Sequence, residues 1–269
     1  MKHLTIEQCR PYLMGILNHV DSFCRDNNIK YSLGYGSLLG AIRHKGFIPW
    51  DDDIDIIMTR DNYNRFIELH HLLTEETGRY RIRKGQEIAN HLHAVVSDEN
   101  TFVTFHKGTT DERFYHGGVW LDLFPLDNVV DEKAYEHIWH KIFKLRERQQ
   151  LAEIGGLPRH SKWNRRFRNF LHPFFKPFAK KIGKRIGSYM QGANGSDTSY
   201  YASFSVWYWK QKAINKGLFD DYIEVVFEGG NYLAISGYDE YLRGLYGDYM
   251  TPPPEEDRVP KHSYQAYLK

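Results

Sequence analysis

The feature that most constrains this chain is a glycine-serine turn followed closely by a ladder of aspartates. The stretch ends in Pro49-Trp-Asp-Asp-Asp-Ile-Asp-Ile56. If this part is a β-strand, Asp51, Asp53 and Asp55 share one face, because successive side chains of a strand point to opposite sides. Carboxylates held this close repel one another unless a cation lies among them, and Mg²⁺ takes oxygen ligands and bridges substrate phosphates. The ladder therefore predicts a metal site for chemistry on phosphate.

The alternative is a solvated acidic turn at Asp51-Asp52-Asp53, which is what most short acidic runs are. Apolar residues follow the acids at once, at Ile54, Ile56, Ile57 and Met58. A strand that leaves the core with acids at its mouth has this composition, whereas a solvated turn does not need it. The metal site is the better interpretation.

A second acid, Asp122, is the sole ionisable side chain in the apolar and aromatic run from Val119 to Phe124. A buried lone acid is costly unless it is paired or bound to a metal. Asp122 is therefore a candidate third ligand beside Asp53 and Asp55. The alternative is a salt bridge to an arginine in the core.

The glycine-serine turn, Gly34 to Gly36, leads into a short helix that starts at Ser37. Free N–H groups and the dipole at a helix start suit a phosphate, and the Ser37 hydroxyl can add a hydrogen bond. The basic run Arg43-His44-Lys45 follows and could hold the phosphate of a leaving group. A solvated basic helix end, favoured by the dipole, explains this run equally well.

Periodicity predicts short strands alternating with helices. The expected helices are Thr5–Asn27, with a capping box at Thr5 and Gln8, then 37–44, one from Asp61, 133–153 and 238–246. The expected strands are 29–33, 51–58, 80–83, 91–97, 101–105, 119–124 and 223–227.

Composition fits one elaborate domain or two smaller ones. The chain has 269 residues, of which 41% are apolar, enough for a large core. No window reaches the about 18 consecutive apolar residues of a membrane span, and the first ten residues lack the apolar part of a secretory signal. We therefore expect a cytoplasmic protein. Cys9 and Cys24 lie too far apart along one helix to form a disulfide, so both should be reduced core residues.

The basic residues are unevenly spread. Between Glu153 and Asp197 there is no acid but ten Lys or Arg, and the other 26 basic residues face 34 acids, so an acidic body carries a basic segment. This segment also holds Trp163, Phe167 and Phe170, which favours a helix pair at the inner face of a membrane, attracted to anionic lipid. Nucleic acid is not expected, because no binding motif accompanies the charge. A surface helix with a solvated face is the remaining alternative.

Three blocks of the sequence resemble the LicD/fukutin family of phosphotransferases. They are Gly36-Ser-Leu-Leu-Gly-Ala-Ile-Arg-His-Lys-Gly-Phe-Ile-Pro-Trp-Asp-Asp-Asp-Ile-Asp-Ile56, Trp120-Leu-Asp-Leu-Phe-Pro-Leu-Asp127 and Tyr238-Asp-Glu-Tyr-Leu-Arg-Gly-Leu-Tyr-Gly-Asp-Tyr-Met-Thr-Pro-Pro-Pro254. The resemblance implies an α+β, nucleotidyltransferase-like fold, in which a mixed β-sheet core has flanking helices and a basic helical insertion. We expect residues 1–153 to form the catalytic core, 154–197 the basic aromatic helical segment and 198–269 the part that completes the catalytic domain.

The same resemblance implies a reaction. Family members transfer phosphocholine, or a related phosphate such as ribitol or glycerol phosphate, from a CDP-activated donor such as CDP-choline to a sugar hydroxyl, releasing CMP. The acceptor would be a cell-surface glycan precursor of teichoic acid or lipopolysaccharide, which can be carried on a lipid.

Site residues carry over by position. Gly36 and Ser37 match the phosphate-holding turn, Asp53 and Asp55 the metal-binding pair, and Asp122 the third carboxylate, with Asp51 close by. The implied cofactor is Mg²⁺ or Mn²⁺.

Two other functions stay open. One is a nucleotidyltransferase that moves the nucleoside monophosphate and releases pyrophosphate, and the other is a non-catalytic, membrane-associated, glycan-binding protein.

Choline adds one requirement, because a quaternary ammonium binds in an aromatic cage. The candidates are Tyr201, Phe204, Trp207, Tyr208 and Trp209, and the alternative is that they form core. The pairs His70-His71 and His91-x-His93 lack a third ligand at zinc spacing and are expected to be ordinary histidines.

Overall fold

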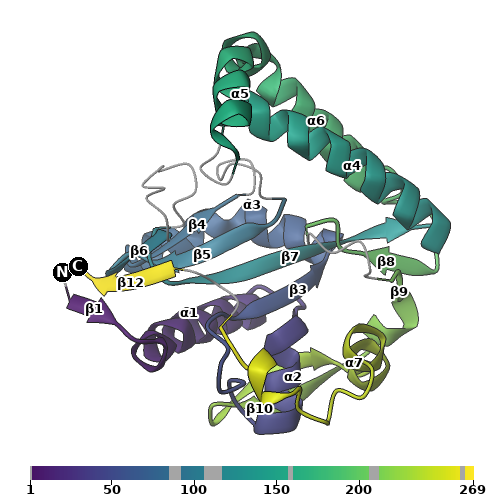
Figure 1. The fold of residues 1–269 in the computed structure, drawn as a ribbon. Helices are drawn as coiled ribbons and strands as arrows, with labels where there is room; N and C mark the ends of the chain where they lie inside the picture. The colour runs from purple at the N-terminus through teal and green to yellow at the C-terminus, as the bar shows by residue number, and fades with distance from the viewer. Residues whose placement is uncertain (1, 85–91, 106–116, 157–159, 206–211, 261–263) are drawn as a thin grey trace.

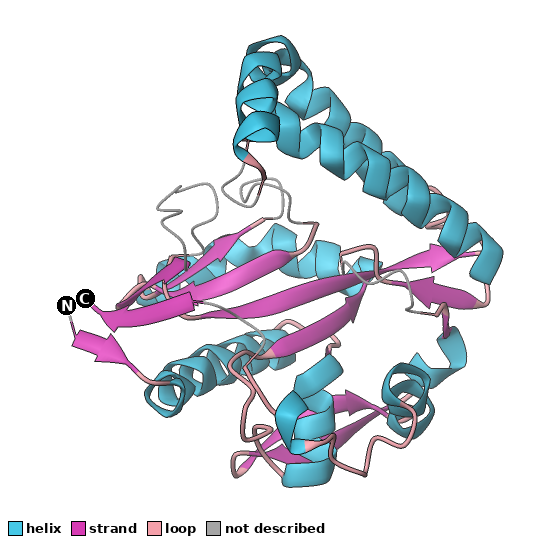
Figure 2. Cartoon of the chain, in the orientation of Figure 1, coloured by secondary structure: helices cyan, strands magenta, loops and turns pink. Residues whose placement is uncertain are grey.

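A mixed sheet of seven strands forms the centre of the fold (Figure 1, Figure 2). The computed structural model describes residues 2–84, 92–105, 117–156, 160–205, 212–260 and 264–269. In the sheet the order is β2-β3-β7-β5-β4, and β8 and β9 extend it from the far half of β7. The bounds are β2 Ser32–Leu33, β3 Asp55–Thr59, β4 Tyr80–Arg83, β5 Ala94–Asp98, β7 Trp120–Val129, β8 Tyr200–Ala202 and β9 Ile214–Asn215. The α+β class expected from the sequence is confirmed.

Strands β3 and β7 are the only parallel neighbours described in this sheet, and they set the geometry of the acids. Asp55, the first residue of β3, is paired in register with Asp122 of β7. Both strands are almost wholly buried, which explains their near-continuous apolar composition. The register places two acids side by side where the strands begin.

Helices α1 (Ile6–Asp26) and α3 (Arg60–Thr77) pack beside each other and against the sheet. The rings of Phe23 and Phe66, one from each helix, lie 5.5 Å apart, edge to face. The capping box at the start of α1 is confirmed: the Thr5 hydroxyl accepts from the Gln8 N–H, and the Gln8 side chain accepts from the Thr5 N–H. Helices α1 and α3 thus bury one another's apolar residues against the central sheet.

The remaining strands tie distant parts of the chain together. Strands β1 (Lys2–Leu4), β12 (Tyr264–Leu268) and β6 (Thr101–Phe105) form a separate antiparallel sheet, so the two ends of the chain lie side by side (Figure 1). Strands β10 (Tyr222–Phe227) and β11 (Gly230–Ile235) form a hairpin against α2 (Tyr35–His44) and β2, and α7 (Tyr238–Tyr246) follows it.

Three helices form a second layer that projects from one side of the sheet (Figure 1). They are α4 (Glu132–Glu153), α5 (Lys162–Phe175) and α6 (Ala179–Met190). A hydrophobic cluster of their own, which includes Tyr135, Ile186 and Phe204, packs between α4, α6 and β8. Within the described part of the chain, no helix combines the length and hydrophobicity that crossing a bilayer requires. The division into residues 1–153, 154–197 and 198–269 stays a prediction.

A buried ion pair joins α3 to β7, and a hydrogen bond links it to the residues after α6. Arg60 donates two hydrogen bonds of 2.7 Å to Asp127, whose carboxylate also accepts from Asn194, just beyond α6. The Arg60 side chain is 9% exposed and that of Asp127 is fully buried. The charges of Arg60 and Asp127 are therefore paired with each other.

Two predicted strands have different bounds in the structure. The strand expected over 51–58 begins only at Asp55, so Asp51 and Asp53 belong to the loop before it. The strand expected over 119–124 continues through Pro125 to Val129. Pro125 is tolerated because β5 ends its pairing at Leu123 and β8 begins at Asp127, so the missing N–H lies where β7 changes partner.

Candidate active site

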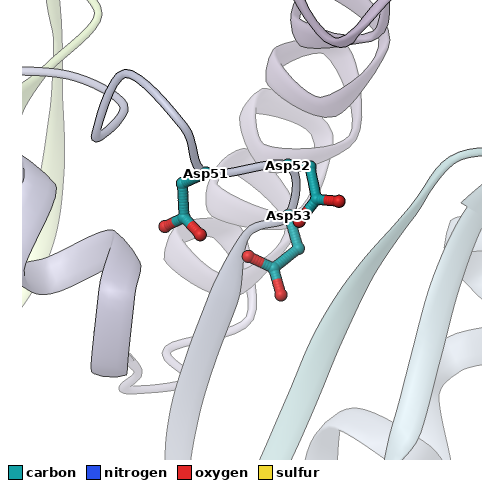
Figure 3. Close-up of side chains that lie close together, drawn as sticks. All are labelled: Asp51, Asp52 and Asp53. Atoms are coloured by element: carbon teal, nitrogen blue, oxygen red, sulfur yellow. The ribbon is translucent and has the colours of Figure 1, made fainter. Parts of the chain in front are cut away.

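Acids from the loop before β3 and from two neighbouring strands converge at one end of the sheet. Asp53, Asp55 and Asp122 each offer an oxygen, and these oxygens all lie within 4.8 Å of one another. Asp51, Asp52 and Asp53 form a second such group, so Asp53 belongs to both. Figure 3 shows the three side chains on the loop before β3. Asp51 and Asp53 therefore precede the strand in which they were expected, and the common face with Asp55 stays a prediction.

The start of α2 holds Asp55 through its main chain. The Asp55 N–H donates to the Ser37 hydroxyl oxygen at 2.9 Å, and the Asp55 carbonyl accepts from the Gly34 N–H at 2.9 Å. Ser37 is buried, and its hydroxyl oxygen accepts this hydrogen bond inside the protein. The glycine-serine turn thus fixes the acid strand against the helix, a role that the sequence did not suggest.

Glycine at position 36 lets the helix approach the acids. A Cβ atom there would lie 2.6 Å from Oδ2 of Asp51, closer than real Cβ contacts allow. The carboxylate of Asp51 therefore lies directly against the first turn of α2, where free N–H groups favour negative charge. The helix start and the acid group form one continuous site.

Asp122 is held by two side chains that sequence reasoning did not connect with it. Trp120 donates its indole N–H to Oδ2 at 3.0 Å, and Nε2 of His93 lies 2.9 Å from Oδ1. An ionised carboxylate only accepts, so Nε2 is the nitrogen that carries the proton. Outer groups of this kind orient metal ligands. The expected alternative, a salt bridge from Asp122 to a core arginine, stays open, although the arginine at the start of α3, Arg60, pairs with Asp127.

Two tyrosines distant in sequence surround the acids. Burial and the charges of Asp55, Asp51 and Asp53 raise the pKa of Tyr246, at the end of α7. Tyr264 of β12 donates its hydroxyl to the Asp52 carbonyl at 2.8 Å, and its pKa is raised by burial and by Asp52. Both phenols stay protonated at neutral pH and can donate hydrogen bonds. Only the spatial pairing of β12 reveals Tyr264, since no sequence motif surrounds it.

The predicted basic residues lie at the other end of α2. Arg43 is seven residues beyond Gly36, so it lies on the same face of the helix about 10 Å along it. Its Nη1 donates to the Tyr249 carbonyl at 2.7 Å, and its Nε donates to Nε2 of His44 at 2.9 Å. Lys45 ends the helix in the left-handed conformation and is exposed.

A second arginine, which sequence analysis did not select, lies close to Arg43. Burial and the charge of Arg258 lower the pKa of Arg43. The guanidinium of Arg258 lies 5.7 Å from the centre of the Trp50 ring, next to Asp51 in the chain. The Arg258 Nε also donates to the Pro253 carbonyl at 2.9 Å, so main-chain contacts hold both arginines.

The acids fit a divalent cation. Mg²⁺ binds six oxygens at about 2.1 Å, so adjacent ligands lie about 3 Å apart and opposite ones about 4 Å apart. The oxygens of Asp53, Asp55 and Asp122 fall within a comparable spread. Asp53 and Asp122 are also buried, and buried carboxylates this close need a positive charge. The residues present could therefore hold Mg²⁺ or Mn²⁺.

Other predicted residues lie elsewhere. Phe204 is buried in the helical layer, as the core alternative expects, and Lys216 lies 4.9 Å from the centre of the Tyr201 ring, while the aromatic cage stays a prediction. Trp207, Tyr208, Trp209 and His91 lie outside the described residues. Cys9 and Cys24 are buried and free, as expected.

The fold and the site define an α+β protein whose acids meet at the start of a parallel strand pair, beside a glycine-rich helix start. A sequence profile of the LicD/FKTN/FKRP nucleotidyltransferase domain matches residues 28–180. The chain is 31% identical, over the full length of both proteins, to the lipopolysaccharide cholinephosphotransferase LicD of Haemophilus influenzae. It is also similar to an uncharacterized protein of Rickettsia typhi, at 32% identity over 57% of this chain and 47% of that protein.

The chain belongs to the LicD family. The matched segment, residues 28–180, includes all the acids of the site and the turn before them. The resemblance seen in the sequence is therefore confirmed.

Proposed function

We propose that this protein transfers phosphocholine, or a related alcohol phosphate, from a CDP-activated donor to a sugar hydroxyl of a cell-surface glycan precursor. The observation that carries the proposal is the convergence of Asp53, Asp55 and Asp122 in a chain similar over its whole length to a lipopolysaccharide cholinephosphotransferase. Similarity to this relative makes lipopolysaccharide the first acceptor to propose, and teichoic acid is the alternative.

The reaction exchanges one phosphate ester for another. The acceptor oxygen forms a bond to the phosphorus that carries choline, and the bond from that phosphorus to the bridging oxygen breaks, so CMP leaves with the bonding electrons. The acceptor proton passes to a carboxylate of the cluster. Mg²⁺ or Mn²⁺, when bound, supplies positive charge to the phosphate oxygens.

The chain's own groups position the reactants. His93 and Trp120 fix both oxygens of Asp122, which suits a rigid ligand. The N–H groups at the start of α2 can donate to a phosphate beside Gly36. Arg43, further along the same face of α2, and the neighbouring Arg258 can hold the leaving CMP phosphate, while the protonated Tyr246 can donate to an oxygen near the acids. Phosphoryl transfer depends mainly on such positioning and charge neutralisation.

Product analysis tests the reaction. The purified protein is incubated with a panel of CDP-choline, CDP-ribitol and CDP-glycerol, a lipopolysaccharide acceptor and Mg²⁺, and the products are separated by chromatography. We expect one donor to be consumed with equimolar CMP, and its alcohol phosphate to appear on the glycan. Formation of pyrophosphate from CTP and an alcohol phosphate, without transfer to glycan, would support the nucleotidyltransferase instead. If none of these substrates is consumed, the glycan-binding alternative gains support.

Metal binding can be measured without turnover. Mn²⁺ titrated into the protein should lose its free-ion electron paramagnetic resonance signal, and Mg²⁺ should compete for the site. A variant in which Asp122 is changed to Asn should bind Mn²⁺ more weakly. Equal binding by this variant and the natural chain would remove Asp122 from the proposed ligand set.

A further inference from the structure

Helix α5 exposes a stripe of large aromatic side chains. Trp163, Phe167, Phe170 and Phe174 follow one another at four- and three-residue steps, so they lie on one face of the helix. Phe178 continues the row in the turn after the helix. These five side chains are between 53% and 79% exposed, and α5 has no buried residue. Among the described residues, Phe143 is the only other Phe or Trp that is classed as exposed.

Polar contacts hold the opposite side of α5. The Arg168 Nε donates to the Gly155 carbonyl at 3.1 Å, and the Asn169 side chain accepts from the Gly156 N–H at 2.8 Å. Helix α5 also packs on α4. The helix is therefore fixed with its aromatic face outward, at the end of the helical layer that lies highest in Figure 1.

Exposed cations flank this aromatic stripe. On α5 they are Lys162 and Arg166, and on α6 they are Lys180, Lys181 and Lys184. No acid occurs anywhere between Glu153 and Asp197. A row of rings with cations beside it matches the boundary between acyl chains and anionic headgroups of a phospholipid bilayer.

The geometry points to α5 as a membrane-docking helix, which inserts its aromatic stripe among the acyl chains of an anionic lipid surface while the flanking cations contact the headgroup phosphates. Other partners fit less well. A second copy of the chain would bring two sets of cations together, and nucleic acid is less favoured because no binding motif accompanies the charge. The inference does not depend on the proposed reaction, because docking can occur without transfer.

Vesicle sedimentation with the full chain tests this inference. We expect binding to vesicles of phosphatidylcholine and phosphatidylglycerol in a 3:1 ratio to be roughly tenfold or more tighter than to phosphatidylcholine alone, and to weaken in high salt. Changing Phe170 and Phe174 together to Ser should reduce binding to the mixed vesicles roughly tenfold or more. Lys180→Gln with Lys181→Gln should reduce it and flatten its salt dependence.

Matched controls come from other surfaces. Val259→Ser removes an exposed apolar side chain outside the helical layer, and Lys133→Gln removes an exposed cation of α4. Both should bind vesicles like the natural chain. If the double Ser variant has lost its thermal transition, the single change Trp163→Ser takes its place.

Three results would overturn the inference. The first is absence of binding to any vesicle, and the second is unchanged binding after loss of the aromatic side chains. The third is a dimer in sedimentation equilibrium, or a complex with an RNA oligonucleotide, that depends on Phe170 and Phe174 while vesicles are not bound.

Discussion

The acid cluster and helix α5 reverse the usual placement of side chains in opposite ways. At the start of β3 and β7, carboxylates lie buried, as Asp53 and Asp122 show, whereas on α5 aromatic rings face solvent. Burying charge costs free energy unless the charge is paired, and exposing large apolar patches costs free energy unless something covers them. Both arrangements are therefore unfavourable unless a partner compensates for them. This difference is the basis of the two proposals, in which a divalent cation binds at the acids and an anionic lipid surface binds at α5.

The two regions also differ in how they are held. The acids are fixed by several elements at once, since the start of α2 binds Asp55 and the side chain of His93 binds Asp122. Helix α5 is fixed mainly through α4 and the turn at Gly155. We therefore expect substitutions at the acids to change the rate of transfer, and substitutions on α5 to change binding to membranes.

The largest effect is expected at the acids themselves. Changing Asp55 to Asn should reduce transfer by about 10²–10³-fold or more, because a neutral amide removes one charge from the proposed metal site while keeping its shape. The initial rate of CMP release, measured with Mg²⁺ and CDP-choline, checks this. Asp197→Asn, an exposed acid near the end of the helical layer, is the matched control and should leave the rate unchanged. Full activity of the Asp55 variant would contradict the proposed mechanism.

The largest effect on stability is expected at the buried ion pair between α3 and β7. Changing Arg60 to Met leaves the buried carboxylate of Asp127 without its ion pair, which should cost about 3–5 kcal/mol of unfolding free energy. Chemical denaturation measures this loss. Arg243→Met breaks an exposed pair with Asp239 and should cause no measurable change. Equal stability of the two variants would show that the buried pair contributes no more to stability than the exposed one.

The sequence predicts the acids of the site and several helices and strands, but not the contacts that support the acids. Asp53, Asp55 and Asp122 follow from acids placed next to apolar runs, and the strands 80–83 and 101–105 and the helix 238–246 match the predicted bounds. The strand at 51–58 was too long because alternation of side chains persists in the extended loop before Asp55. Strands β1, β8, β9, β11 and β12 were missed because they are short or are defined by distant partners, not by their own pattern.

The contacts around the acids were missed for the same reason. His93 and Tyr264 become neighbours of the site only through the pairing of β5 with β7 and of β12 with β6. Composition carries no record of such pairings. Arg258 was overlooked because it lies in an exposed loop, where a lone arginine is ordinary.

A smaller effect is expected at His93, which separates positioning from chemistry. His93→Ala removes the donor to Asp122 and should weaken Mn²⁺ affinity and transfer by about 10–100-fold. His93→Gln keeps an N–H donor and should recover part of the loss. Paramagnetic resonance titration gives the affinity, and steady-state kinetics gives kcat and KM. A purely structural histidine would instead lower thermal stability in both variants and leave Mn²⁺ affinity unchanged.

The smallest effects are expected at two glycines, Gly36 beside the acids and Gly187 in α6 of the helical layer. The first substitution should lower the transfer rate, and the second should raise the stability. Gly36→Ala places a methyl group against the Asp51 carboxylate, so that side chain must move, and transfer should fall roughly tenfold with little loss of stability. Gly187→Ala in α6 meets no atom within 4 Å and should raise the unfolding free energy by about 0.5–1 kcal/mol, because alanine favours the helix. Transfer rates and thermal melts of both variants give the comparison. If Gly36→Ala keeps full activity, the close approach of α2 to Asp51 has no part in the reaction.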